Sequence, residues 1–540
     1  MNLSLVGINA RYTHSNLALR YLRQQIDHDL HRCFLQEFTI HDRNDCILNE
    51  IWKNNPDVVT ISVYIWNSLI VGLLLKDIKK IMPKTKIILG GPEVSYNPDE
   101  WLYRFPAVDH IVCGAGEYGF TKVVEAVYNN ENLGQIIQYP VTDLNAITFP
   151  YKDEDFPEMK QRYVYYESSR GCLFRCSFCI SSRNDIPIQY RNLDIVFSEL
   201  DYLISKKVNI IKFVDRTFNA DKHRARTIWK YLIKKNPKTR FHFELHPALM
   251  EDKDFQILAD APAGLFQFEI GIQSVNPLTL ESINRPLKWG QISAKLARLT
   301  RMSHIHHHLD IIVGLPFDDL DSIRQAFNRV YSLHADHFQM GFLKVLPGTM
   351  MAAQSREYNL TSSDTPPYEI LGNRWLSYAE IRYLHKIEFW LNILYNSHQF
   401  NRFLENIVQY YSTPYDFFTE LADFAQQYPT YKDWKKNVGI LLDFCVTSND
   451  SEFLRDCLRW DWCQQYGSHY YPPRLQNKTC NLAKKLGYPK LKDIFADNRD
   501  TSHKRAIFFM PSSAKFAEKY ELKNRIVAFV RDHRPIRIDL

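Results

Sequence analysis

Three cysteines lie close together in one short stretch of this 540-residue chain. Cys172, Cys176 and Cys179 follow the spacing Cys-x3-Cys-x2-Cys, whereas the other seven cysteines are scattered. Thiolates in this pattern can bind three irons of a cubane cluster, which leaves the fourth iron open. An amino-acid amine and carboxylate can chelate that iron, so the pattern predicts a catalytic 4Fe-4S cluster that binds a small molecule directly.

A zinc knuckle and a purely structural cluster are the alternatives for these cysteines. Both normally require a fourth Cys or His at close spacing. The residues after Cys179 are Ile180, Ser181, Ser182 and Arg183, which supply neither. The cluster with an open iron is therefore the preferred interpretation.

The string from Ser169 to Cys179, SRGCLFRCSFC, resembles the signature loop of the radical S-adenosylmethionine superfamily. The resemblance includes the aromatic Phe178 before the last cysteine. It implies that Cys172, Cys176 and Cys179 hold the cluster and that Phe178 contacts the cofactor. It also implies anaerobic reductive cleavage of S-adenosylmethionine to methionine and a 5′-deoxyadenosyl radical, fed by a one-electron donor such as flavodoxin or ferredoxin.

Six strand candidates alternate with helical stretches around this loop, at residues 163–167, 210–214, 241–245, 266–272, 309–313 and 338–345. Such alternation predicts a partial (β/α)6 barrel over residues 151–355, with its chemistry at the C-terminal strand ends. Along the strands, period-two alternation sends one set of polar residues inward: His242, Glu244, His246, Gln267, Glu269, Gly271 and Gln273. Buried polar groups need partners, which a zwitterionic nucleoside supplies, although a self-satisfied polar layer is the alternative for any one residue.

Family resemblance adds roles to residues of this barrel. The segment 269–274 with Arg285 resembles the part that contacts the ribose and carboxylate of the cosubstrate, and 310–316 resembles the strand that meets adenine. Asp215 stands where the family contacts the methionyl amine, although the usual Gly-Gly-Glu is absent. The residues that we assign to the cofactor here are Asp215, Glu244, Glu269, Gln273, Ser274, Arg285, Asp310 and Gly314.

Residues 1–150 also alternate strands with helices, the strand candidates being 3–8, 34–40, 58–63, 86–89 and 110–113. This predicts a doubly wound, Rossmann-like parallel sheet whose ligands bind at the carboxyl ends of the strands. No G-x-G-x-x-G follows the first strand, so a dinucleotide site is not indicated and a generic α/β domain stays open. The small and polar residues at the strand ends are Ser62, Gly90, Gly91, Glu93, Gly114, Gly116 and Glu117.

These strand ends resemble the cobalamin-binding domain that precedes many radical S-adenosylmethionine cores. The resemblance implies that the residues just named contact cobalamin. The motif Asp-x-His-x-x-Gly, which supplies a histidine below cobalt, occurs nowhere in the chain. We therefore expect no histidine ligand on cobalt, and His14 is the only histidine placed to contradict this.

Residues 356–540 are rich in helix signals, such as the capping box Ser377-Tyr378-Ala379-Glu380, and predict a mostly helical third domain. The net charge of +6 comes from interleaved charges and does not support nucleic-acid binding. No stretch approaches the roughly 20 apolar residues that span a bilayer, so we expect a cytoplasmic protein without a membrane partner.

Together these features favour a cobalamin-dependent radical enzyme that methylates an unactivated carbon of an unidentified substrate. A cobalamin-assisted radical cyclase or rearrangement enzyme is one alternative. A methylthiotransferase is another, but it needs a second cluster, for which Cys33, Cys46 and Cys113 are poorly placed. A non-catalytic cobalamin-binding sensor would have no use for the three-cysteine loop.

Overall fold

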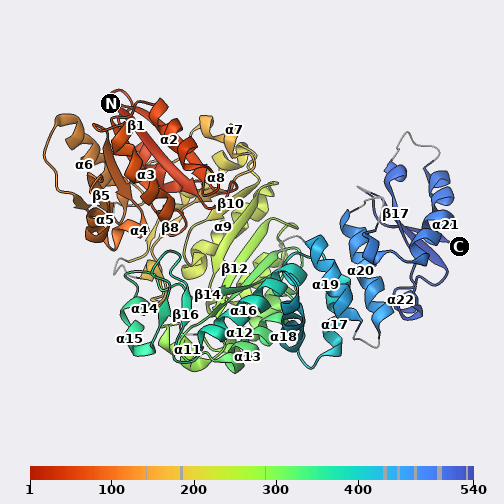
Figure 1. The fold of residues 1–540 in the computed structure, drawn as a ribbon. Coiled ribbons are helices and arrows are strands. Elements are labelled where there is room, and N and C mark those ends of the chain that lie inside the picture. The colour runs from red at the N-terminus through yellow and green to blue at the C-terminus, as the bar shows by residue number, and fades with distance from the viewer. Residues whose placement is uncertain are drawn as a thin grey trace. The chain divides into compact units, whose positions relative to one another are not determined.

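The computed structural model of the protein describes residues 1–140, 143–182, 187–285, 287–429, 434–446, 450–466, 471–495, 502–530 and 533–540. The chain forms two compact units, whose elements are labelled in Figure 1. One unit consists of residues 1–326, 333–335 and 340–381, and the other of residues 327–332, 336–339 and 382–540.

The first sheet is parallel and six-stranded, in the order β2-β1-β3-β4-β5-β6. Its strands are β1 (Asn2–Asn9), β2 (Arg32–Thr39), β3 (Val58–Ser62), β4 (Lys86–Gly90), β5 (His110–Cys113) and β6 (Ile136–Gln138). All five predicted strands are present, and β6 was not predicted. Because β2 and β3 flank β1 on opposite sides, the strand order reverses there, and ligands of such sheets bind at the strand ends near that reversal.

Helices cover both faces of this sheet. Core residues of α2 (Asn44–Lys53) and α3 (Ser68–Ile81) pack with Val6 and Ile61 on one face. On the other face, α1 (Leu17–Gln24) and α6 (Gly116–Asn129) pack with Leu5 and Ile88. The prediction of a doubly wound domain is therefore confirmed.

The second sheet has the order β14-β13-β12-β11-β10-β7, in which the strands from β7 to β13 pair in parallel. Its strands are β7 (Val164–Tyr166), β10 (Ile210–Phe213), β11 (Arg240–Leu245), β12 (Phe266–Gln273), β13 (His306–Val313) and β14 (His337–Phe342). All six were predicted. Helices such as α9 (Lys222–Lys235) and α12 (Trp289–Thr300) connect them, as in a partial barrel (Figure 1).

Side chains of this sheet alternate as the sequence predicts. Phe241, Phe243, Phe266 and Phe268 are completely buried in an aromatic core. The residues between them point to the opposite face, where polar groups gather. That face provides the setting for the site described below.

The second unit is mostly helical, as predicted, and its longest described helices are α20 (Ser451–Tyr466) and α21 (Lys478–Ile494). It also contains an antiparallel sheet that was not predicted, made of β17 (Ile507–Phe509), β18 (Arg525–Phe529) and β19 (Ile536–Asp539). Among the helices of the described ranges, none combines the length and the apolar character that crossing a membrane requires.

Candidate functional site

The three cysteines lie on the loop that follows β8 (Ser169–Arg170). The N–H of Cys179 donates to the carbonyl of Cys176 over 3.0 Å, and the N–H of Phe174 donates to Cys172 Sγ over 3.4 Å. Burial raises the pKa of the Cys176 thiol, and the neighbouring Cys179 and Cys172 add to this, because like charges at close range disfavour ionisation. Cys172 and Cys179 therefore lie near enough to Cys176 to affect its ionisation, and Phe178, which precedes Cys179, is partly buried.

Backbone hydrogen bonds hold this loop against the end of the barrel. The N–H of Ser177 donates to the carbonyl of Ile283 over 3.0 Å, and its carbonyl accepts from the N–H of Met351 over 2.8 Å. Within the described ranges, no three Cys, His, Asp or Glu side chains converge on a single metal ion. A cubane does not require this, since each of its irons takes one thiolate, and none of the three thiols is used in a disulfide. The donor set thus fits a cluster and does not fit a mononuclear metal.

Arg285 is the cation next to the cysteines. Its Nη1 lies 3.6 Å from Cys176 Sγ, and its Nη2 donates to the carbonyl of Gly271 over 2.5 Å. The guanidinium opposes the effect of burial and favours the Cys176 thiolate. Arg285 therefore stabilises the ionised form that iron needs.

Asp215 follows β10 and is used to anchor the start of the cysteine loop. Its carboxylate accepts hydrogen bonds from Ser168 N (2.8 Å), Ser168 Oγ (2.6 Å) and Ser169 Oγ (2.8 Å). Burial raises its pKa, while the bonds from Ser168 and Ser169 oppose that rise. These partners come from the protein itself, so the observed geometry gives Asp215 a positioning role for the loop.

The inner face of the barrel carries paired polar side chains. His242 Nε2 lies 3.0 Å from Glu269 Oε2, and His308 Nε2 lies 2.9 Å from Asp310 Oδ1. Burial opposes the ionisation of Glu269, but the bond from His242 and nearby charges lower its pKa to about 2. Burial, together with the carboxylates of Glu269 and Asp310, raises the pKa of Glu244 to about 7.

A bulge at the end of β12 brings Gln273 beside Gly271. The pairing with β13 shifts between these two residues, and Gln273 adopts a φ of 72°. A Cβ on Gly271 would meet Gln273 Nε2 at 2.0 Å, so any other residue at position 271 would displace the Gln273 amide from this position. Gln273 Oε1 is buried and accepts no hydrogen bond from the described protein. Unlike Gln273 Oε1, the buried hydroxyl of Ser274 has a partner within the protein, because it donates to Asp318 Oδ1 over 3.0 Å.

Gly314 and Glu93 are both held by the segment 361–376 that follows the barrel. A Cβ on Gly314 would meet Ile370 at 2.7 Å, and the Gly314 carbonyl accepts from Asn373 Nδ2 over 2.9 Å. Glu93 Oε1 accepts from the Tyr368 hydroxyl over 2.5 Å. Their observed partners are therefore protein groups of this segment.

A cavity of about 490 Å³ opens between the two sheets of this unit. Six of the seven strand-end residues singled out in the sequence line it, namely Ser62, Gly90, Gly91, Gly114, Gly116 and Glu117, and Glu93 does not. Across the cavity lie Glu167, Ser169, Arg170, Gly171, Ile180 and Arg216, which belong to the cysteine loop and its surroundings. At Gly91, with a φ of 106°, a Cβ would meet the Val63 carbonyl oxygen at 2.5 Å, so packing against Val63 requires glycine there. At Gly114, no atom of the described residues lies within 4 Å of the Cβ position, which leaves that strand end open to a ligand. This glycine-lined cradle fits a large planar cofactor.

Arg170 connects the two walls of the cavity. Its Nη2 lies 2.7 Å from Glu117 Oε1 in the first sheet domain and 2.8 Å from Glu167 Oε2. Burial disfavours the charged guanidinium, but the two carboxylates more than compensate and raise the pKa of Arg170. Sequence reasoning missed this role, although Arg170 is part of the signature string. Arg216, which follows β10, was also missed.

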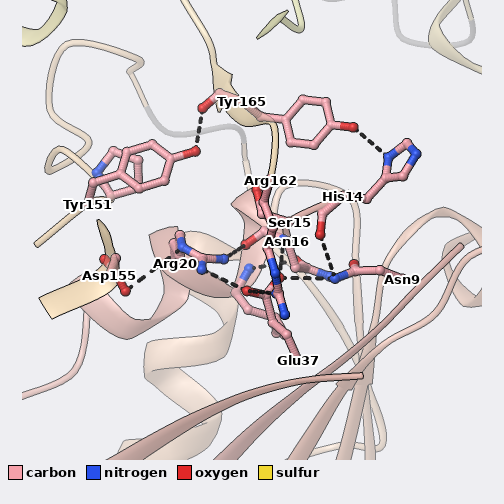
Figure 2. A network of polar contacts seen from close by, with 12 residues as sticks. Asn9, His14, Ser15, Asn16, Arg20, Glu37, Tyr151, Asp155, Arg162 and Tyr165 are labelled. Carbon is pink, nitrogen blue, oxygen red and sulfur yellow. Dashed lines mark hydrogen bonds and ion pairs between the residues drawn. The ribbon is translucent and has the colours of Figure 1, made fainter. Parts of the chain in front are cut away.

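His14 is not among the residues that line the cavity. Figure 2 shows its Nδ1 toward the Tyr165 hydroxyl, at 2.6 Å. The residues before α1 are held by Glu37, which accepts from Asn16 N–H and forms a 2.7 Å ion pair with Arg20 (Figure 2). None of the residues that line the cavity in the described ranges is a histidine.

Comparisons with known proteins agree with this arrangement. Residues 3–124 match the family described as "B12 binding domain", and residues 166–330 match "Radical SAM superfamily". Residues 356–521 match a "Protein of unknown function (DUF4080)". The chain is therefore a radical S-adenosylmethionine enzyme with a cobalamin-binding domain, and its cofactors are a 4Fe-4S cluster, S-adenosylmethionine and cobalamin.

Individual relatives match long stretches of this chain. An "Uncharacterized methyltransferase PH0819" of Pyrococcus horikoshii is 23% identical over 403 residues, which cover 69% of this chain and 83% of the relative. The "2-(S-pantetheinyl)-carbapenam-3-carboxylate methyltransferase" of Streptantibioticus cattleyicolor is 25% identical, over 50% of this chain and 44% of that protein. This chain thus spans less than half of the second relative.

The fold is also that of a solved structure. The "Cobalamin-dependent S-adenosylmethionine radical enzyme OxsB with aqua-cobalamin bound" superposes with a TM-score of 0.60 at 13% identity. The match covers 92% of this chain and 81% of that one. At this identity the likeness concerns the fold.

Proposed function

We propose that this enzyme methylates an unactivated carbon of an as yet unidentified substrate. Both relatives described above are named methyltransferases, which supports the proposal. We also propose a division into a cobalamin domain (1–150), a barrel (151–355) and a third domain (356–540). Flavodoxin or ferredoxin is the kind of electron donor that we expect.

The observation that carries the proposal is the composition of the two cavity walls. One wall is the glycine-rich set of strand ends, and the other leads directly into Cys172. When bound, cobalamin can carry a methyl group, and the cluster with S-adenosylmethionine can generate the substrate radical that accepts it. A cavity that adjoins both sites suits an enzyme that uses both cofactors on one substrate.

The chain's own residues keep these parts in place. Asp215 fixes the entry into the cysteine loop through Ser168 and Ser169. Arg170 joins the loop to Glu117 of the cobalamin domain, and Arg285 stabilises the Cys176 thiolate. Preorganisation of this kind limits the motion between two cofactors that must react with one substrate.

The methylthiotransferase alternative lacks support in the side-chain positions. Cys46 is exposed on α2, Cys33 lies in β2, and Cys113 ends β5. A sensor without catalytic activity leaves the three-cysteine loop unexplained.

The test uses the full-length protein, reconstituted anaerobically with iron, sulfide and cobalamin and supplied with a reductant and cell extract. A methylase should release 5′-deoxyadenosine from one S-adenosylmethionine and S-adenosylhomocysteine from another, in step with methyl gain by the substrate. Changing Cys172, Cys176 and Cys179 together to Ala should abolish iron binding and 5′-deoxyadenosine. Changing Cys457 to Ala, a buried thiol of the second unit, is the matched control and should leave both unchanged.

Two results would contradict the proposal. If 5′-deoxyadenosine forms without methyl gain or S-adenosylhomocysteine, a cobalamin-assisted cyclisation or rearrangement becomes the better assignment. If the triple variant keeps the absorption of the cluster and the Cys457 variant loses it, the cluster lies elsewhere.

A further inference from the structure

His246 is a buried histidine whose ring is fixed in place beside the cysteine loop. It directly follows β11, and only 2% of its surface is exposed. The backbone N–H of His246 donates to Asn219 Oδ1 over 2.9 Å, and the backbone carbonyl of His246 accepts from Asn219 Nδ2 over 3.0 Å. The ring stacks on Phe174, with centroids 4.0 Å apart and planes 22° apart. Backbone and ring are thus both held.

Neither ring nitrogen of His246 has a hydrogen-bond partner among the described residues. A buried polar group without a partner is costly, and native proteins rarely keep one without a reason. Two neighbours of the cysteine loop share the property, since Gln273 Oε1 and Arg285 Nε are also buried without a partner. Three side chains at one end of the barrel therefore have hydrogen-bonding capacity that the described residues do not use.

The chemistry of these groups selects the ligand atom that they suit. Burial, and then the charge of Arg285, lower the pKa of His246, so the imidazole is neutral and offers one N–H donor. Arg285 provides positive charge beside Cys176. A neutral N–H and a guanidinium together match a carboxylate. A cationic group would meet repulsion from Arg285.

We propose that His246 donates a hydrogen bond to the carboxylate of S-adenosylmethionine, next to Arg285, where the amino acid part of the cosubstrate binds at the open iron. His246 is therefore a binding residue of the cosubstrate that the signature motifs do not contain. The inference rests on the cofactor set and not on the methyl transfer proposed above. It can fail while methyl transfer stands, and the reverse is also possible.

The test compares two probes, S-adenosylmethionine and its decarboxylated analogue, on the reconstituted protein. Binding is measured by equilibrium dialysis without reductant, so no turnover is needed. His246→Phe keeps the stacking on Phe174 and removes the N–H, and it should weaken binding of S-adenosylmethionine by about ten- to a hundredfold, the usual loss for a hydrogen bond to a charged group. The same variant should bind the decarboxylated analogue as the wild type does.

The stability of the cofactor-free protein provides the second readout. Since His246→Phe removes two unsatisfied nitrogens from the interior, its melting temperature should be unchanged or higher. His307→Phe is the control, because His307 is equally buried but lies near Phe268, with ring centroids 6.0 Å apart, on the opposite face of the sheet. That control should bind both probes like the wild type. His246→Gln keeps an N–H donor and should retain part of the affinity if the phenylalanine variant fails to fold.

Two outcomes would overturn the proposal. An equal loss of affinity for both probes in His246→Phe would show that His246 does not contact the carboxylate. A lower melting temperature in His246→Phe with unchanged binding of S-adenosylmethionine would make His246 a structural residue.

Discussion

Replacement of Asp215 by Ala separates two roles that can be assigned to this carboxylate. Family resemblance implies a contact with the methionyl amine, whereas the structure shows three hydrogen bonds to Ser168 and Ser169. Asp215 is 1% exposed, and Arg224 donates from the other side to the Ser168 carbonyl over 3.1 Å. The carboxylate therefore belongs to a buried network that holds the start of the cysteine loop.

The cost of breaking this network follows from its members. The Ser168 N–H cannot turn to another acceptor, and a buried unsatisfied donor costs about 1–3 kcal/mol. The two hydroxyls can reorient and lose less, so the total for Asp215→Ala is about 3 kcal/mol. For a unit of about 370 residues, an unfolding entropy of roughly 0.8 kcal/mol/K converts this to a decrease of about 4 °C in melting temperature. Asp215→Asn keeps one acceptor oxygen and should cost about 1 kcal/mol.

The assay measures the melting temperature of the cofactor-free protein and the iron retained per chain after anaerobic reconstitution. Asp215→Ala should lower both, because the residues that lead into Cys172 lose their anchor. Asp318→Ala is the matched control. Asp318 is also a buried carboxylate, which accepts from Ser274 Oγ and Thr279 Oγ1, but it does not contact the cysteine loop. It should lower the melting temperature and leave the iron content unchanged.

One result would refute this reasoning about Asp215. If Asp215→Ala keeps the melting temperature and the iron content of the wild type but binds S-adenosylmethionine poorly, the carboxylate serves the ligand directly. The role implied by family resemblance would then be correct, and the three hydrogen bonds would contribute little.

Two further predictions concern the barrel and the cobalt. Because burial and the carboxylates of Glu269 and Asp310 raise the pKa of Glu244 to about 7 in the folded protein, unfolding releases a proton between about pH 4.5 and 7, and stability falls as the pH rises through that range. Glu244→Gln should remove this fall and be more stable than the wild type above pH 7 by up to about 3 kcal/mol, as measured by urea unfolding; equal slopes in the two proteins would contradict it. Electron paramagnetic resonance of the reduced cobalt form should show no nitrogen superhyperfine coupling from the protein, because His14 faces Tyr165. Coupling that disappears in His14→Ala would disprove this.

Local alternation in the sequence was enough to predict most of the strands that position the site. Each of the eleven predicted strands combines apolar residues with a period of two or a short buried run, and each is present. The strands that were missed are short or carry charges, as in the three residues of β6 and in β19 with Arg537 and Asp539. Such segments become strands because neighbouring strands pair with them, which periodicity alone does not reveal.

The cysteines and the strand-end glycines could be identified because their chemistry depends on residue type and close spacing. The roles of other site residues depend on partners far away in the sequence. Asp215 bonds to residues 46 and 47 positions earlier, and Arg170 to Glu117, 53 positions earlier. The sequence placed His246 on the inner face, but only the structure shows that its ring nitrogens have no hydrogen-bond partner among the described residues.

The segment 361–376 contacts two residues that the sequence assigned to cofactor binding. Gly314 and Glu93 come from different domains, and both were expected to contact a cofactor. Ile370 and Asn373 meet Gly314, while Tyr368 of the same segment bonds to Glu93. Glycine is needed at position 314 because its φ is 90° and Ile370 occupies the space of a Cβ, a requirement that holds without any ligand. A residue type that fits a cofactor motif can therefore be fixed by packing, and only a ligand-binding measurement separates the two causes.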